Sequence, residues 1–141
     1  QFIGGDGLFS PALIDIGGEA VEGLLLTTPF IVHAGSDDPR ARSFRTAFME
    51  KFDSREPDTW AALTYDAANQ LFDVIGRVGP DRQAIRDGLA AANSPENAYD
   101  GVTGATYYDE HVDCPKPAPV AYVRDAEFVP AVDQLGVTST L

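Results

Sequence analysis

Side chains that could perform nucleophilic chemistry are few in this sequence. Acyl transfer by a serine needs a histidine to take the hydroxyl proton and a carboxylate to orient that histidine. The chain has two histidines, His33 and His111, and both fall in segments that we expect to be loops. It has no G-x-S-x-G motif, so no serine is marked as the nucleophile of a strand-to-helix turn. The sequence therefore offers no positive evidence for an enzyme, and we expect a non-enzymatic protein.

One close cluster of potential metal ligands occurs near the C-terminal third of the chain. Ligand types alone specify a metal weakly, and the same residues are typical of a polar turn between strands. We therefore expect a turn and predict neither a metal site nor a cofactor, with an enzyme that uses this cluster as the remaining alternative. The cluster consists of Asp109, Glu110, His111, Asp113 and Cys114.

A glycine-rich loop holds the most distinctive carboxylate. Gly4-Gly5-Asp6-Gly7 surrounds Asp6 with three glycines, which predicts a tight turn whose backbone can approach another object closely. Phosphate does not suit this loop, because the P-loop lysine and the G-x-G-x-x-G spacing are missing and a carboxylate repels an anion. A turn aspartate that bonds its own backbone is the structural alternative for Asp6.

The charge of the whole chain excludes two classes of partner. Its 141 residues include 10 Lys and Arg against 22 Asp and Glu, a formal net charge of −12. Such a surface repels nucleic acid and anionic lipid, so we expect neither as a partner. The 44% of hydrophobic and 23% of charged residues are ordinary for a globular protein, and no apolar run is long enough to cross a bilayer. The single cysteine, Cys114, is expected to be an ordinary thiol and does not identify a compartment.

The elements that position Asp6 follow from local patterns near the start of the chain. The chain opens directly on an apolar strand with no basic segment before it, which fits a mature chain or an excised fragment. Ser10 and Pro11 suit the N-cap and the first position of a helix that ends near residue 18. Continuous apolar residues then predict a buried strand over residues 20–28. A strand, a helix and a strand in this order are typical of a parallel α/β layer.

Three helices and further strands are expected after an irregular segment at residues 28–38. Helices are predicted from Asp38-Pro39 to Phe52, over residues 59–78, and shortly after Gly79-Pro80. Strands are predicted at residues 105–108, 120–124 and 127–130, the last two as a hairpin. The helix over residues 59–78 is apolar nearly all round, so it must be covered on several sides. A chain of 141 residues can barely supply that cover alone.

Three stretches of sequence, in a fixed order, match one family. The first is FIGGDGLFSP at residues 2–11 with GEAVEG at 18–23 and TTPF at 27–30, and the second is EPDTWAALTYDA at 56–67. The third runs from GVTG at 101–104 through YDE at 108–110 to VAYV at 120–123 and EFVP at 127–130. Together they resemble the C-terminal part of the branched-chain amino-acid binding proteins of ABC importers. That family has the type I periplasmic-binding fold, in which two α/β lobes joined by three crossovers close on a ligand.

The resemblance implies an α/β chain with a partial type I periplasmic-binding fold. Its parts would be a βαβ unit, three helices and a C-terminal pair of strands. Residues 1–29 resemble the end of the second lobe, residues 38–113 part of the first lobe, and residues 119–132 the hairpin that returns to the second. A piece of this kind completes neither lobe, so a stable chain needs a rearranged fold, a homodimer or strand exchange between copies, or an additional N-terminal piece.

The resemblance also implies two ligand-binding residues. Asp6 occupies the position of an acidic residue that meets the α-ammonium of an amino acid through a charge-assisted hydrogen bond. Trp60 occupies the position of an aromatic residue that faces the cleft, with core packing at a helix start as its alternative. Tyr65 matches a family tyrosine that we expect in the core. The family's groups that bind the ligand carboxylate lie in the first half of the parent, outside this sequence.

The function implied by the resemblance is the capture of an amino acid or related small polar solute in an interlobe cleft. The partners would be that small-molecule ligand and, through the full-length parent, an ABC permease. The location would be outside the cytoplasm, in the periplasm or lipid-anchored outside the cell membrane. The alternative is an extracytoplasmic sensor of the same fold that signals to a receptor or regulatory partner.

Overall fold

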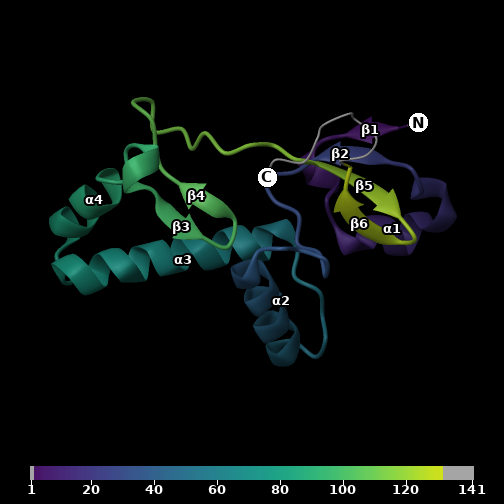
Figure 1. Cartoon of the computed structure of the whole chain (residues 1–141), viewed down its shortest axis with the longest axis horizontal. Helices are drawn as coiled ribbons and strands as arrows, with labels where there is room; N and C mark the ends of the chain where they lie inside the picture. Colours follow the sequence, from purple (N-terminus) through teal and green to yellow (C-terminus); the bar gives the residue numbers. More distant parts are fainter. Residues whose placement is uncertain (1, 132–141) are drawn as a thin grey trace.

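The computed structural model describes residues 2–131, which form two units joined by two connecting segments (Figure 1). We call residues 2–28 with 119–131 the sheet unit and residues 39–106 the helical unit. The first connector is residues 29–38 and the second connector is residues 107–118. Within the described residues, no helix combines the length and the apolar character that crossing a membrane requires.

The sheet unit contains the predicted βαβ arrangement and the predicted hairpin. Strand β1 (Ile3–Gly4), helix α1 (Pro11–Gly17) and strand β2 (Leu25–Thr27) come first, and β5 (Val120–Arg124) and β6 (Glu127–Pro130) come last. The sheet order is β1-β2-β5-β6, with β1 parallel to β2 and the other pairs antiparallel. Strands from both ends of the sequence therefore share one sheet, and β5 lies between β2 and β6.

The strand predicted over residues 20–28 is shorter than expected. Residues Gly18–Val21 instead form a 3-10 helix, η2, directly after α1. Gly18 has a φ of +50°, a conformation that suits glycine and lets the chain turn sharply at the end of α1. A Cβ at Gly17 would collide with the side chain of Val21, so the two glycines allow η2 to fold back closely on α1.

The core of the sheet unit lies between the sheet and α1. Leu26, Ala121 and Val123 are fully buried, and the ring of Phe9 stacks on that of Phe128 with 4.3 Å between centroids. Leu13 and Ile14 of α1 pack against this cluster. The loop that carries Asp6 is therefore held at both ends, by β1 and by the buried Phe9.

The helical unit consists of three helices and a small hairpin. Helix α2 spans Pro39–Lys51, α3 spans Thr59–Val78 and α4 spans Arg82–Ala90, each with an aspartate N-cap that accepts a backbone N–H. Helix α3 begins and ends as predicted. Strand β4 (Gly104–Thr106) replaces the strand expected at 105–108, and it pairs with β3 (Tyr99–Gly101), which has no counterpart among the predicted strands. The hairpin lies along α3, and α4 lies at the end of α3 far from the sheet unit (Figure 1).

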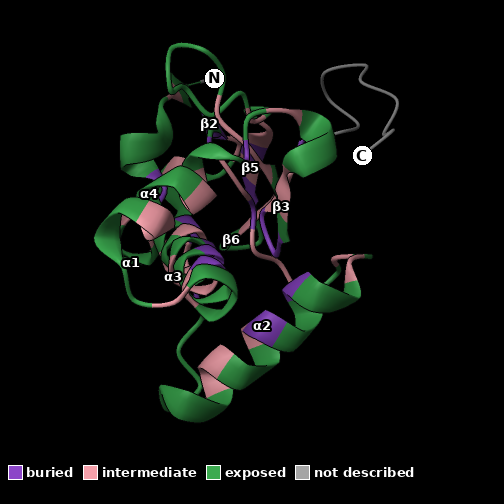
Figure 2. Ribbon diagram, turned by 90° about the vertical axis from the view of Figure 1, so that its left-hand side faces the viewer, coloured by how far each residue is buried: buried purple, intermediate pink, exposed green. Residues whose placement is uncertain are grey.

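The first connector joins the cores of the two units. Ile31 is buried in the cluster of the sheet unit, whereas Phe30 and Val32 pack against the cluster of the helical unit around Phe44 and Ala62. This alternation of side chains is that of an extended segment lying between two apolar surfaces. Helix α2 is otherwise largely exposed (Figure 2), so the connector is an important part of its cover.

Candidate functional site

Asp6 lies directly after β1, in the short 3-10 helix η1 (Asp6–Leu8). The loop is closed by its backbone, since Leu8 N–H donates to the Gly5 carbonyl (3.1 Å) and Phe9 N–H to that of Asp6 (2.9 Å). The Asp6 side chain is exposed, and within residues 2–131 no hydrogen bond or ion pair holds its carboxylate. A Cβ at Gly4 would lie 2.5 Å from Leu8 Cδ1, so a larger residue there would displace the Leu8 side chain. The carboxyl ends of parallel strands are where open α/β sheets bind ligands, and Asp6 stands at such an end.

Trp60 lies in the first turn of α3 and is 47% exposed. It lines a wide groove of about 1100 Å³ between α2, α3 and the β3–β4 hairpin. Tyr65, also 47% exposed, lines the same groove, with its ring 4.9 Å from that of Phe44. The expectation that Tyr65 is a core residue is therefore wrong. The buried face of α3 is formed by residues spaced one turn apart, including Ala62 and Asp66, and Tyr65 falls beside that face.

A smaller cavity of about 150 Å³ lies where the sheet unit meets the helical unit. Phe9, which follows η1, and Asp58, which precedes α3, both line it. The structure thus brings together the segments that carry the two predicted ligand-binding residues. It does not bring the two side chains into one pocket, since neither Asp6 nor Trp60 lines this cavity, and Asp6 does not line the groove of Trp60.

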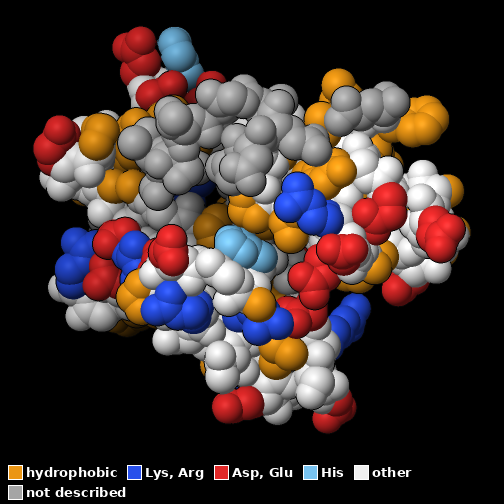
Figure 3. Space-filling view, turned by 45° about the vertical axis from the view of Figure 1, so that its right-hand side comes forward, with side chains coloured by type: hydrophobic (Ala, Val, Ile, Leu, Met, Phe, Trp, Pro, Cys, Tyr) orange, Lys and Arg blue, Asp and Glu red, His pale blue; other side chains and the backbone are white. Residues whose placement is uncertain are grey.

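The small cavity also contains charged and titratable groups. His33, half-buried in the first connector, lines it beside the ion pair of Arg45 and Glu56, in which Arg45 Nε donates to Glu56 Oε2 at 2.8 Å. Burial lowers the pKa of His33, while the charge of Asp37 opposes that shift and the charge of Arg45 adds to it. Hydrophobic side chains and a histidine gather near the centre of one face of the molecule (Figure 3). The sequence placed His33 in a loop but carried no signal of its burial.

The cluster at residues 109–114 forms a polar turn. Asp109 Oδ1 accepts the backbone N–H groups of His111 (2.8 Å) and Asp113 (2.9 Å), and Cys114 is exposed. Among the residues that the structure describes, no three or more His, Cys, Asp or Glu side chains converge on a point that could hold a metal ion.

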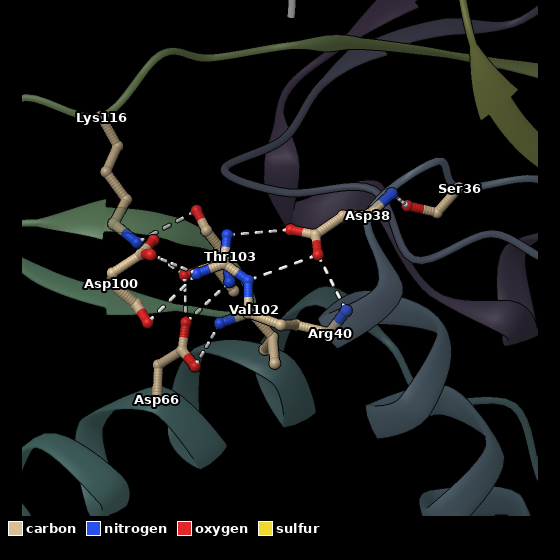
Figure 4. Close-up of polar contacts among 8 residues, drawn as sticks. All are labelled: Ser36, Asp38, Arg40, Asp66, Asp100, Val102, Thr103 and Lys116. Atoms are coloured by element: carbon tan, nitrogen blue, oxygen red, sulfur yellow. Dashed lines mark hydrogen bonds and ion pairs between the residues drawn. The ribbon is translucent and has the colours of Figure 1, made fainter.

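A buried carboxylate that sequence reasoning missed organises the helical unit. Asp66, 4% exposed, accepts hydrogen bonds from the N–H of Val102 (2.8 Å) and from the N–H (2.7 Å) and Oγ1 (2.6 Å) of Thr103 (Figure 4). Lys116 of the second connector donates from Nζ to Thr103 Oγ1 at 2.6 Å, and burial lowers the pKa of this lysine. A Cβ at Gly101 would collide with the Asp66 carboxylate. One side chain therefore ties together α3, the turn of the β3–β4 hairpin and, through Thr103, the second connector.

An arginine at the rim of the wide groove joins α2 to the hairpin. The Arg40 guanidinium donates to Asp38 Oδ2 (3.1 Å) and forms an ion pair with Asp100 (2.5 Å). These carboxylates raise the pKa of Arg40, and the hydrogen bonds from Arg40 lower the pKa of Asp38. Two carboxylates therefore already balance the charge of Arg40 at the rim of the groove.

The comparison with known families agrees with this architecture. Residues 1–126 match the family model described as periplasmic binding protein. The chain belongs to the periplasmic binding protein family. This confirms the family resemblance and the partial α/β fold that the three sequence stretches predicted.

Relatives within the periplasmic binding protein family are much longer than this chain. The Leu/Ile/Val-binding protein homolog 1 of Brucella suis is 32% identical over 125 residues, which cover 86% of this chain and 31% of the relative. The chain thus spans about a third of the length of the curated relatives it matches.

This chain likewise matches only about a third of the length of solved periplasmic binding proteins. The leucine-binding protein LivK of Thermotoga maritima has 37% identity and a TM-score of 0.74, over 91% of this chain and 35% of that protein. The LivJ protein of Streptococcus pneumoniae, solved with isoleucine, has a TM-score of 0.75 over 89% of this chain and 34% of that protein, but at 24% identity it shows the fold alone.

Proposed function

We propose that this chain forms part of the capture site of a solute-binding protein of an ABC importer, and that the solute is an amino acid or a related small polar molecule. The names of the relatives support this ligand class. The Brucella relative is called a Leu/Ile/Val-binding protein homologue and the Thermotoga relative a leucine-binding protein.

The two units supply the two sides of the proposed cleft. We assign residues 1–29 and 119–132 to one lobe and residues 38–113 to the other, residues 1 and 132 lying outside the described residues. The separate cores of the sheet unit and the helical unit support this assignment. We assign the two connectors between these units as crossovers between the lobes. Closure of the lobes on a ligand would then rotate one unit against the other about these connectors.

The exposed Asp6 carboxylate is the observation that carries the proposal. It stands at the carboxyl end of a parallel strand, on a loop fixed by β1 and Phe9, and no described group neutralises it. A carboxylate in that position binds a ligand ammonium through charge-assisted hydrogen bonds. Trp60, half-exposed across the junction, presents an apolar ring suited to an aliphatic or aromatic side chain of the ligand.

The remaining parts of the proposed role concern the whole binding protein. Capture is non-enzymatic and needs no cofactor, and the loaded protein delivers its ligand to an ABC permease outside the cytoplasm. Membership of the family and the names of the relatives support these parts of the proposal.

Calorimetry with L-leucine, L-isoleucine and L-valine tests the proposal. The sample is a hybrid in which this chain replaces the matching segment of the Thermotoga leucine-binding protein, so that both sides of the cleft are present. Asp6→Asn is expected to weaken binding on the order of 10- to 100-fold, the value of a hydrogen bond to a charged group. Asp15→Asn, which changes an exposed aspartate of α1, serves as the matched control and leaves affinity unchanged. A folded hybrid that binds equally well with and without the Asp6 carboxylate would exclude the role of this residue.

A further inference from the structure

The second connector, residues 107–118, is fixed to the helical unit at two points. At its start, the Tyr108 N–H donates to the Ala92 carbonyl at 2.8 Å. Near its other end, Lys116 Nζ donates to Oγ1 (2.6 Å) and to the carbonyl (3.2 Å) of Thr103 (Figure 4). Among the described residues, these two bonds of Lys116 are the only hydrogen bonds that join residues 109–118 to either unit.

The turn between these two points forms hydrogen bonds only within itself. The Asp109 N–H donates to the Asp113 carbonyl at 2.9 Å, and Asp109 Oδ1 accepts the N–H groups of His111 and Asp113. Cys114, which follows the turn, is exposed. Without the bonds of Lys116, the connector would therefore have no hydrogen bond to either unit from residue 109 to residue 118.

The contact between Lys116 and Thr103 continues to a buried charge. Thr103 Oγ1 accepts from Lys116 and donates to Asp66 Oδ2 at 2.6 Å, so this hydroxyl has a donor on one side and an acceptor on the other. Burial lowers the pKa of Lys116, and the charge of Asp66 opposes that shift. Hydrogen bonds with a charged partner are stronger than neutral ones, and burial strengthens them further. Lys116 is therefore held more firmly than a lysine in an exposed ion pair.

Only a short piece of the connector remains free between the two units. Pro119 already belongs to the sheet unit, where its carbonyl accepts the N–H of Thr28 at 3.0 Å. Pro117 and Ala118, both exposed, lie between this bond and the contact of Lys116. Lys116 and Ala118 each precede a proline, which restricts them to extended conformations. The piece of the connector that can bend is therefore short and stiff.

We propose that Lys116 is a positioning residue that holds the second connector on the helical unit through Thr103 and Asp66, so that this connector bends only at Pro117 and Ala118. Without the contact, the bending segment would extend back to residue 109. A longer segment loses more conformational entropy when the units close on a ligand, about threefold in the closing equilibrium for each doubling of its length. The effect on ligand binding rests on the proposed function, whereas the contact itself does not.

Hydrogen–deuterium exchange in the 141-residue chain tests the contact without a ligand. Lys116→Met keeps the length of the side chain but removes its donors. We expect the amides of residues 109–116 to exchange on the order of 10-fold faster, the value of one hydrogen bond to a charged group, while strands β2 and β5 keep their rates. Arg82→Met, which removes one positive charge from an exposed position of α4, is the matched control and leaves the connector unchanged. Equal exchange of the connector in Lys116→Met and in the original chain would overturn the proposal.

Two substitutions of Thr103 test whether Lys116 acts through this residue. Thr103→Val removes the hydroxyl at nearly constant volume and should raise the exchange of the connector as Lys116→Met does. Thr103→Ser keeps the hydroxyl and should keep the original rates. A connector that exchanges equally in both variants would overturn the route through the hydroxyl.

The hybrid with the Thermotoga protein tests the consequence for capture. By calorimetry, Lys116→Met should weaken the binding of L-leucine on the order of 3- to 10-fold, and Arg82→Met should leave it unchanged. Unchanged affinity in Lys116→Met, together with faster exchange of the connector, would overturn the role of Lys116 in closure. A parent hybrid that binds no L-leucine would contradict the proposed function instead, and the exchange rates would still decide whether Lys116 holds the connector.

Discussion

Individual residues in this protein derive their roles from contacts that only the fold creates. Asp66 is one polar residue in a largely apolar helix, and its sequence context gives no indication of a partner. In the structure it accepts hydrogen bonds from Val102 and Thr103, 36 and 37 residues away along the chain. A buried carboxylate that accepts three hydrogen bonds stabilises its surroundings, whereas its removal leaves buried donors unpaired.

Replacing Asp66 should therefore destabilise the helical unit strongly. In Asp66→Asn the amide nitrogen cannot accept, so at least one buried donor at Val102 or Thr103 loses its partner, and we expect a loss of about 2–3 kcal/mol in the free energy of unfolding. Urea denaturation, monitored by circular dichroism, measures this loss of stability. Asp73→Asn on the same helix removes only an exposed ion pair with Arg77 and should change stability by about 0.5 kcal/mol or less. Equal effects of the two substitutions would contradict the role given to Asp66.

His33 should make stability depend on pH. Because burial lowers its pKa in the folded state below the ordinary histidine value of about 6.5, the unfolded chain binds more protons as the pH falls below neutral. The free energy of unfolding should therefore decrease as the pH falls through about 6.5 and level off below the folded-state pKa.

Urea unfolding between pH 8 and pH 5 measures this dependence. His33→Gln should make the free energy of unfolding depend less on pH than in the original chain. His111→Gln, at an exposed position, should leave this pH dependence unchanged. A slope that is unaffected by His33→Gln would show that protonation of this ring is not coupled to folding.

Sequence patterns predicted elements well where local signals coincide with the fold. The ends of α3 were predictable, because Asp58 caps its N-terminus and Gly79, with a φ of +80°, ends it. The strand over residues 20–28 was overestimated, because hydrophobicity does not reveal the tight packing of Val21 on Gly17. Strand β3 was missed because its three residues, YDG, carry no β pattern and pair only through the turn that Asp66 holds.

Asp6 could be selected by its glycines and family position, whereas the burial of His33 and Asp66 depends on segments distant in sequence.

A substitution in the turn of the β5–β6 hairpin should increase the stability of the protein. Asp125 and Ala126 have φ values of +53° and +60°, and their N–H groups donate to the Glu22 carboxylate. Since alanine is disfavoured in this conformation, Ala126→Gly should raise the free energy of unfolding by about 1 kcal/mol. Ala105→Gly, in the extended strand β4, should lower it by about 0.5–1 kcal/mol. Thermal denaturation of both variants measures the difference, and a loss of stability in both would contradict the turn assignment.

At the scale of the whole molecule, the chain passes from the sheet unit to the helical unit and back. The resulting sheet depends on strands from both ends of the sequence, since β5 pairs with β2 through Leu26 and Ala121. The burial of Val123 and Ala121 in this sheet therefore holds the C-terminal hairpin in place. Covalent continuity of the second connector is not required for it.

Cutting the second connector should leave the molecule assembled. A thrombin site inserted between Glu110 and His111, both highly exposed, permits cleavage of the folded protein. We expect residues 1–110 and 111–141 to elute together in gel filtration under native conditions and to separate in urea. Separation in native buffer would show that the sheet does not retain the hairpin.

The position of β5 has a consequence for biosynthesis. Residues 39–106 contain the helical unit with its local contacts, so this unit can fold as soon as it leaves the ribosome. Strand β2 must wait for a neighbour that is made 95 residues after it, a delay of about 5–20 s at ordinary rates of translation. During that interval the apolar edge formed by Leu24, Leu25 and Leu26 has no partner. The nascent chain is then open to aggregation at these leucines until β5 pairs with β2.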